Sequence, residues 1–92
     1  DLNTRNIIGE TPLMCAIRNS FYDFIKIMIE IGANVHHRTI GGITALHIAC
    51  IEGKQDICAL LILNGANKES LDMKKKKPID YTQKQNIRIL FA

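Results

Sequence analysis

The chain repeats part of its own sequence at an interval of 33 positions, because residues 11 and 44 begin the same motif. Residues 11–16 read TPLMCA and residues 44–49 read TALHIA, while GAN at residues 32–34 returns at residues 65–67. A fixed period of this length is typical of small supersecondary units stacked on copies of themselves. We therefore expect no single central core, and we expect the function to lie in a surface rather than in an enclosed active site.

The first copy opens with a strong helix start. Thr11 is placed to cap a helix over residues 12–19, and Pro12 stands at the first helical position, where its missing N–H has no cost. Leu13 and Ile17 recur at helical spacing, so one stripe of this short helix is apolar.

A second, antiparallel helix is expected over residues 22–31. It is apolar on nearly all sides, so neighbouring elements must cover it on two sides. Gly32 supplies the left-handed residue that ends this helix, and residues 34–42 form an extended turn that leads into the next copy.

The second copy follows the same plan. Thr44 is placed to cap a helix over residues 45–52, Gly53 makes the turn, and residues 55–64 form the second helix. Beyond it, residues 86–91 leave room for only about two turns of a further helix. The array is expected to end or fray there.

The repeated residues resemble the ankyrin repeat, and the resemblance covers nearly the whole chain. In the first copy the matching positions are Gly9, residues 11–13, Ala16, Ile25 and residues 32–35. In the second they are Gly42, Thr44, Leu46, His47, Ala49, Gly53, Ile57, Leu60, Leu61 and residues 65–67. In a third, degraded copy, KPIDYT at residues 77–82 replaces the usual motif. The resemblance implies an all-α solenoid of helix–turn–helix pairs joined by β-hairpin-like turns.

The register divides residues 1–92, read as a single ankyrin-repeat domain, into four parts. Residues 1–5 are interpreted as the tail of a preceding repeat, residues 6–38 and 39–71 as two repeats, and residues 72–92 as a truncated capping repeat. The opening three residues align with residues 34–36. We therefore expect the sequence to have been excised from a longer protein.

Some positions depart from the family pattern. The resemblance implies that His47 ties neighbouring hairpins together, but Met14 and Asp80 occupy the same position in the other copies. Rigidity is therefore expected to be lower at both ends of the stack. Ser20 stands where the second copy has glycine, so residues 19–20 must make that turn by another route, such as a left-handed conformation at Asn19.

Metal, cofactor and catalytic sites are not expected. Ligand types that zinc prefers are present, namely His36, His37, His47, Cys15, Cys50 and Cys58. No C-x-x-C pair accompanies them, and the register predicts buried helical thiols with His36 and His37 facing solvent from a turn. An activated thiol with an orienting third group is missing, and the glycines at residues 41–42 lack the lysine of a phosphate loop.

Charge and composition limit the partners. The formal net charge of +3 is too small to indicate nucleic acid, and four of the twelve basic residues lie in residues 74–77. This lysine run has two interpretations: a solvated turn, or a nuclear-import or acidic-partner contact. No apolar stretch is long enough for a membrane span, and free thiols favour an intracellular compartment, cytoplasm or nucleus.

The resemblance also implies a partner surface, formed by hairpin tips and inner helices on a concave face. Transferred by register, its variable positions are Arg5, Ile7, Ile8, Glu10, Arg18, Asn19, Arg38, Ile40, Ile43, Ile51, Glu52, Met73, Lys74 and Lys76. Five of these fourteen are isoleucine, and exposed apolar area of this kind marks contact surfaces. We expect three arginines, Arg5, Arg18 and Arg38, to orient and anchor the partner. Alternatively, several isoleucines pack against an upstream repeat or another segment of the parent chain.

The function predicted from these features is non-catalytic protein–protein interaction, in which the concave face binds a peptide or a folded protein. The alternative is a targeting or regulatory segment of a larger enzyme or chromatin-associated protein, with the repeats packing in cis against other domains. Neither interpretation requires a cofactor, nucleic acid or a membrane.

Overall fold

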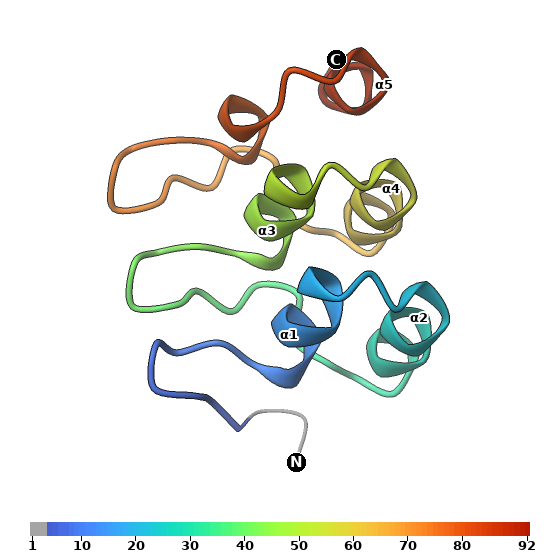
Figure 1. The fold of residues 1–92 in the computed structure, drawn as a ribbon, viewed down its shortest axis with the longest axis vertical. Helices are drawn as coiled ribbons and strands as arrows, with labels where there is room; N and C mark the ends of the chain where they lie inside the picture. The colour runs from blue at the N-terminus through green and yellow to red at the C-terminus, as the bar shows by residue number, and fades with distance from the viewer. Residues whose placement is uncertain (1–3) are drawn as a thin grey trace.

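The computed structural model describes residues 4–92, and its helices stack in three tiers (Figure 1). The elements in chain order are α1 (Pro12–Arg18), α2 (Tyr22–Glu30), α3 (Ala45–Glu52), α4 (Gln55–Leu63), the 3₁₀ helix η1 (Pro78–Tyr81), α5 (Gln85–Arg88) and the 3₁₀ helix η2 (Ile89–Phe91). The described residues contain no strand, so the all-α expectation is confirmed. The proposed alignment of residues 1–3 with a preceding repeat lies outside the described residues.

Each tier places an inner helix beside an outer helix, and a hairpin projects to the same side of the stack (Figure 1). The inner helices α1 and α3 pack on each other, and η1 packs on α3. The outer helices α2, α4 and α5 form a second column beside them. The third tier has α5 and η2 in its outer column, about two turns in all as the sequence predicts.

The inner helices begin where the sequence places their caps. Thr11 accepts a hydrogen bond from the amide of Met14 at 3.4 Å, and Pro12 opens α1. Thr44 accepts from the amide of His47 at 3.3 Å, and Nδ1 of His47 accepts in return from the amide of Thr44 at 3.1 Å. Both caps satisfy amides that a helix start leaves unpaired.

The three hairpins, residues 6–10, 39–43 and 72–76, repeat one geometry. Asn6, Thr39 and Asp72 share a register position, and each accepts backbone amides of its own hairpin through its side chain. Three residues later each hairpin needs a left-handed residue, and the φ angles are 88° at Gly9, 78° at Gly42 and 61° at Lys75. Lysine tolerates this conformation less readily than glycine, so the third hairpin is the most strained of the three.

Backbone hydrogen bonds hold successive hairpins together. The amide of Ile40 donates to the oxygen of Ile8 at 3.3 Å, and the amide of Met73 donates to the oxygen of Gly41 at 2.9 Å. These bonds occupy the same register positions in the two interfaces. The hairpin tips are therefore fixed relative to one another.

Two histidines add side-chain ties. Nε2 of His47 lies 2.9 Å from the oxygen of Lys76 and joins α3 to the third hairpin, as the resemblance implies. The expectation that His37 faces solvent is wrong, because its ring is half-buried and Nε2 lies 2.7 Å from the oxygen of Gly9. His36 is exposed.

Two further expectations need correction. Ser20, not Asn19, adopts the left-handed conformation after α1, with φ of 60°; Asn19 has φ of −94°. Cys15 is only half-buried, whereas Cys50 and Cys58 are buried with their sulfur atoms 3.9 Å apart. The hydrogen bond with Cys58 and burial raise the pKa of the Cys50 thiol far above its ordinary value.

Equivalent positions of α2 and α4 differ sharply in burial. Ile57 and Leu60 of α4 are 1% and 9% exposed, because the first repeat covers them. Their counterparts in α2, Phe24 and Ile27, are 55% and 53% exposed. The face of α2 that carries Phe24 and Ile27 is therefore exposed, whereas the equivalent face of α4 is buried.

Candidate functional site: the hairpin face

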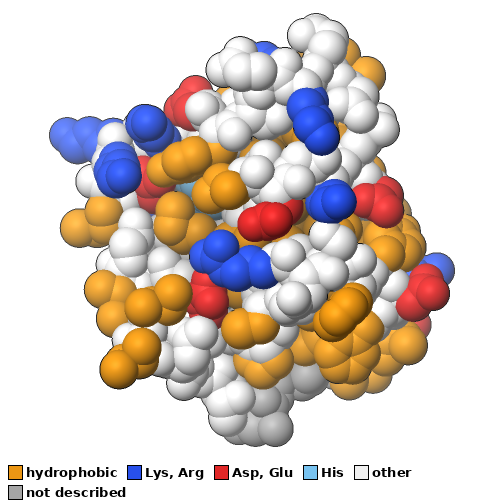
Figure 2. All heavy atoms as spheres, viewed as in Figure 1, with side chains coloured by type: hydrophobic (Ala, Val, Ile, Leu, Met, Phe, Trp, Pro, Cys, Tyr) orange, Lys and Arg blue, Asp and Glu red, His pale blue; other side chains and the backbone are white. Residues whose placement is uncertain are grey.

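Exposed apolar side chains line the hairpin edge of the molecule. Ile7, Ile40 and Met73 occupy the same position in successive hairpin tips and are 94%, 76% and 74% exposed. Figure 2 shows hydrophobic side chains along this edge, with a cluster of basic side chains at its upper end. We call the three residues the tip row. Because the hairpins are hydrogen-bonded to one another, the tip row is a fixed feature of the surface.

A pocket of about 330 Å³ opens between the first two hairpins and α1. It is lined by Ile7, Ile8, Glu10, Arg18, Thr39, Ile40, Gly41 and Ile43. Six of the fourteen residues predicted for the partner surface therefore come together around one hollow. Thr39 and Gly41 were not predicted, although the contact of successive hairpins at these positions follows from the repeat.

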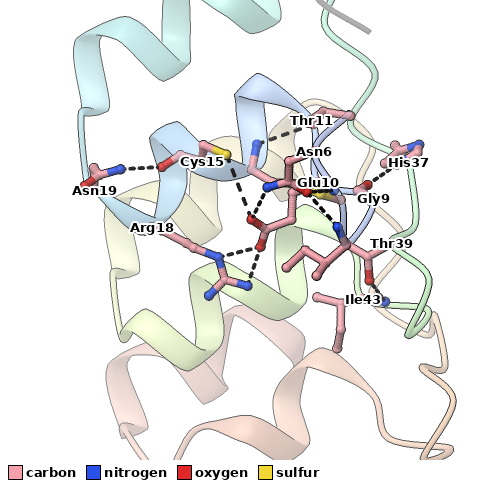
Figure 3. A network of polar contacts seen from close by, with 12 residues as sticks. Asn6, Gly9, Glu10, Thr11, Cys15, Arg18, Asn19, His37, Thr39 and Ile43 are labelled. Carbon is pink, nitrogen blue, oxygen red and sulfur yellow. Dashed lines mark hydrogen bonds and ion pairs between the residues drawn. The ribbon is translucent and has the colours of Figure 1, made fainter. Parts of the chain in front are cut away.

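An ion pair forms the polar wall of this pocket (Figure 3). Nε and Nη2 of Arg18 each lie 2.5 Å from Oε2 of Glu10. The other oxygen of Glu10 accepts from Nδ2 of Asn6 at 3.2 Å and faces the sulfur of Cys15 at 3.9 Å. Since Glu10 is only 5% exposed and its oxygens are occupied, the expectation that it contacts a partner directly is not supported.

Arg18 keeps capacity for a partner. Its side chain is 42% exposed, and Nη1 makes no hydrogen bond with any residue that the structure describes. Its guanidinium is held in place through the two nitrogens that face Glu10. Arg18 therefore presents a positioned donor at the pocket wall.

The other two predicted arginines lie apart from this pocket. Arg5 borders a separate hollow with Pro12 and Cys15. Arg38 reaches across to the third hairpin, where Nη2 donates to the oxygen of Leu71 at 2.5 Å. The three arginines thus do not converge on one anchor point, because register fixes the backbone but not the direction of a long side chain.

The remaining predicted residues divide between surface and structure. Ile51 is exposed on α3, whereas Ile43 and Glu52 are half-buried, and Ile43 packs against the core. Asn19 closes the end of α1 by donating from Nδ2 to the oxygen of Cys15 at 2.8 Å (Figure 3). Lys74 and Lys76 are exposed at the third hairpin.

The lysine run is only partly engaged within the fold. Lys77 pairs with Glu69 at 2.8 Å, and the ammonium of Lys76 lies 5.4 Å from the centre of the Tyr81 ring. Lys74 and Lys75 make no side-chain interaction with the residues that the structure describes. The third hairpin tip therefore carries two exposed ammonium groups, those of Lys74 and Lys75, that form no ion pair with a described carboxylate.

Asp72 anchors this hairpin. Its carboxylate accepts from the Tyr81 hydroxyl and from the amides of Lys74 and Lys76, at 2.8 and 3.0 Å for the two amides. Burial opposes ionisation, but these hydrogen bonds outweigh it and hold the pKa of Asp72 below its ordinary value. The bond to Asp72, together with burial, raises the pKa of Tyr81 to about 12.

Residues 4–92 contain no cluster of three or more histidine, cysteine or acidic side chains that could hold a metal ion. No helix within the same range is long and apolar enough to span a bilayer. The hairpin face offers apolar area, guanidinium and ammonium groups, which suit non-covalent contacts.

These features define an all-α protein built from stacked helix–turn–helix repeats. A family model described as ankyrin repeats (3 copies) matches residues 1–72, and the chain belongs to the ankyrin repeat family. Ankyrin repeats generally mediate protein–protein interaction and form a non-catalytic fold.

Curated relatives carry this unit in different settings. Protein phosphatase 1 regulatory subunit 27 of Mus musculus is 33% identical over 86% of this chain and 51% of its own length. A tyrosine-protein kinase of Hydra vulgaris is 43% identical over 76% of this chain and 10% of its own. An ankyrin and IPT/TIG repeat-containing protein of Schizosaccharomyces pombe is 37% identical over 99% of this chain and 8% of its own. The chain thus spans about half of the regulatory subunit and a small part of the other two.

Proposed function

We propose that this chain is a non-catalytic interaction module, intracellular, that binds a protein partner through its hairpin face. The observation that carries the proposal is the pocket between the first two hairpins, continued along the tip row. Exposed apolar area beside a positioned guanidinium is typical of interface anchors. Three cysteines without a disulfide favour a reducing compartment.

The relatives support a binding role over a catalytic one. One is named as a regulatory subunit, and the match covers only a tenth of the kinase. Proteins with such different names share this unit, so we infer that it supplies a function common to them. Ankyrin repeats generally mediate protein–protein interaction, and protein binding is therefore the function we assign to the unit. The catalytic residues of any larger parent would lie outside this segment.

A site-specific photocrosslinker tests the proposed face. Ile40 is replaced by p-benzoylphenylalanine, and the matched control carries the same residue at Leu63, a leucine at the end of α4 that is 83% exposed against 76% for Ile40. We expect the Ile40 variant to crosslink to a distinct protein in lysate of the source cell, and the Leu63 variant not to do so. Equal labelling from both positions would contradict the proposed face.

A second candidate, packing in cis within a larger protein, is favoured by the exposed face of α2. Phe24 and Ile27 are uncovered although their counterparts in α4 are buried. A regulatory segment that docks against its own parent chain would use such a face. A photocrosslinker at Phe24 that labels only other segments of the full-length parent would favour this candidate over the first.

A further inference from the structure

The hairpin face has an excess of positive charge that the fold does not use. Within residues 4–92, the hairpins contain two carboxylates, Glu10 and Asp72, and both are occupied by internal hydrogen bonds. The same hairpins contain three lysines, Lys74, Lys75 and Lys76. Lys74 and Lys75 have no partner in the described part of the chain. A ligand on this face therefore meets the ammonium groups of Lys74 and Lys75, which form no ion pair with a described carboxylate.

The charge and the apolar surface follow one line across the hairpins. At the first tip Ile7 and Ile8 are apolar, and at the second Ile40 continues the row. At the third tip Met73 is followed directly by Lys74. The surface thus changes along the stack from an apolar pocket to a basic end.

Arg18 adds a guanidinium group to the wall of the apolar pocket. Its Nη1 makes no hydrogen bond with a described residue, while Nε and Nη2 are held by Glu10. A fixed guanidinium with a free nitrogen suits a carboxylate or a backbone carbonyl of a bound segment. It does not suit a cationic side chain.

We propose, resting on the proposed function, that the hairpin face binds an acidic protein segment. The segment seats one large apolar side chain in the pocket between the first two hairpins, and its carboxylates lie over Arg18 and the third hairpin tip. The observation that selects an acidic segment is charge complementarity with Lys74 and Lys75. The apolar anchor follows from the isoleucines that line the pocket.

Selection from a library of random short peptides tests the class of ligand with the 92-residue chain as the target. We expect enriched peptides to combine aspartate or glutamate with one leucine, isoleucine or phenylalanine. Their affinity, measured by fluorescence anisotropy, should fall as salt is raised, because exposed charges are screened. Enrichment of basic or uncharged peptides, or no enrichment at all, overturns the acidic class.

Matched variants locate the site. The charge-reversal pair Lys74→Glu and Lys75→Glu should weaken binding of the selected peptide by about tenfold or more, because like charges oppose each other across an interface. The control pair Lys26→Glu and Lys54→Glu makes the same change in net charge away from the hairpins, because Lys26 lies in α2 and Lys54 directly precedes α4. This pair should leave the affinity within about twofold of the unmodified chain. Equal losses in both pairs would mean that only overall charge matters, which overturns the proposal.

The apolar anchor has its own pair of variants. Ile40→Ser should weaken the same peptide by about tenfold or more, because a buried isoleucine contact is lost. Leu63→Ser, similarly exposed but remote from the hairpins, should have no effect. Helical circular dichroism confirms that each variant is folded before its affinity is compared.

The outcomes separate this proposal from the proposed function. Basic or neutral peptides that depend on Ile40 would overturn the acidic class and leave the hairpin face as a protein-binding site. Peptides that depend on neither Ile40 nor the lysines would contradict both. Tighter binding of a single-stranded oligonucleotide than of any selected peptide would replace the acidic segment by nucleic acid.

Discussion

His37 donates a hydrogen bond to the backbone oxygen of Gly9 across 2.7 Å and joins the chain that leaves the first repeat to the first hairpin. The first copy lacks the histidine that makes the equivalent tie in the second copy. Met14 occupies the position that His47 holds in the second copy, and a methionine has no ring nitrogen that could hydrogen-bond to the next hairpin. The structure thus restores a histidine tie at the first interface from a different position in the chain.

His37→Ala should lower the free energy of unfolding by about 1 kcal/mol, the usual net contribution of one hydrogen bond. His36→Ala is the control, because that side chain is exposed, and we expect a change within about 0.5 kcal/mol. Urea denaturation followed by circular dichroism measures both. Indistinguishable midpoints for the two variants would contradict a structural role for the His37 ring.

The ion pair between Arg18 and Glu10 should behave as a coupled unit. Arg18→Ile leaves the buried carboxylate without its cation and should cost about 1–2 kcal/mol, reduced from the fully buried case because Arg18 is part-exposed. In the second copy Ile43 and Ile51 stand at the equivalent positions. The double variant Glu10→Ile with Arg18→Ile should therefore recover most of the lost stability.

A thermal-melting double-mutant cycle checks this coupling. Strict additivity of the two single changes would show that the two side chains act independently. The predicted recovery also requires that the new isoleucines pack as their counterparts do. Loss of cooperativity in the double variant would contradict that equivalence.

Equivalent substitutions in α2 and α4 should have unequal effects. Ile57→Ala removes a side chain that is 1% exposed and should cost about 2–4 kcal/mol. Phe24→Ala, at the same register position but 55% exposed, should cost less than about 1 kcal/mol despite the larger side chain. Guanidinium denaturation compares them. Equal costs would mean that a further element covers Phe24 in solution.

Stability should fall at alkaline pH through Tyr81. Its pKa is raised to about 12 in the folded state, whereas an unfolded tyrosine ionises near pH 10. The folded state therefore favours the protonated phenol, and this stabilisation is complete below about pH 10 and lost as pH rises toward about 12. Spectrophotometric titration of Tyr22→Phe, which leaves Tyr81 as the sole tyrosine, should show the delayed ionisation.

At acid pH the same hydrogen bond acts through Asp72. The pKa of Asp72 is lowered in the folded state, so its contribution is present above the unfolded value near 4 and disappears as pH falls through the folded value. Tyr81→Phe should reduce both the alkaline and the acid dependence. If Tyr81→Phe leaves the acid or the alkaline dependence of stability unchanged, other groups cause the loss of stability in that pH range.

Helix positions followed from the sequence because their causes are local. Thr11 and Thr44 cap the inner helices within a few residues of their own position, and the expected ends lie within about one residue of the observed ones. The 33-residue register predicts which residues occupy equivalent positions in successive hairpins. The contact of the first two hairpins around one pocket follows from that equivalence. Both depend on short-range patterns that repeat.

The errors fall where side chains from different segments of one repeat meet, or where two neighbouring residues compete for one backbone conformation. Glu10 was expected on the partner surface, but Arg18, the last residue of α1, pairs with its carboxylate. His37 looked like a solvent-facing turn residue, but the first hairpin approaches its ring. At the turn after α1, Ser20 took the left-handed conformation that the sequence assigned to Asn19.

The sequence by itself determined the repeat, the helices and the order in which equivalent residues line the stack, because caps, glycines and apolar periodicity act over short distances. Tertiary structure alone decided which of those residues remain available to a partner. Phe24 and Ile57 share one register position, yet one is exposed and the other buried. Burial depends on what packs against a surface, and a residue's place within its own repeat does not specify that neighbour.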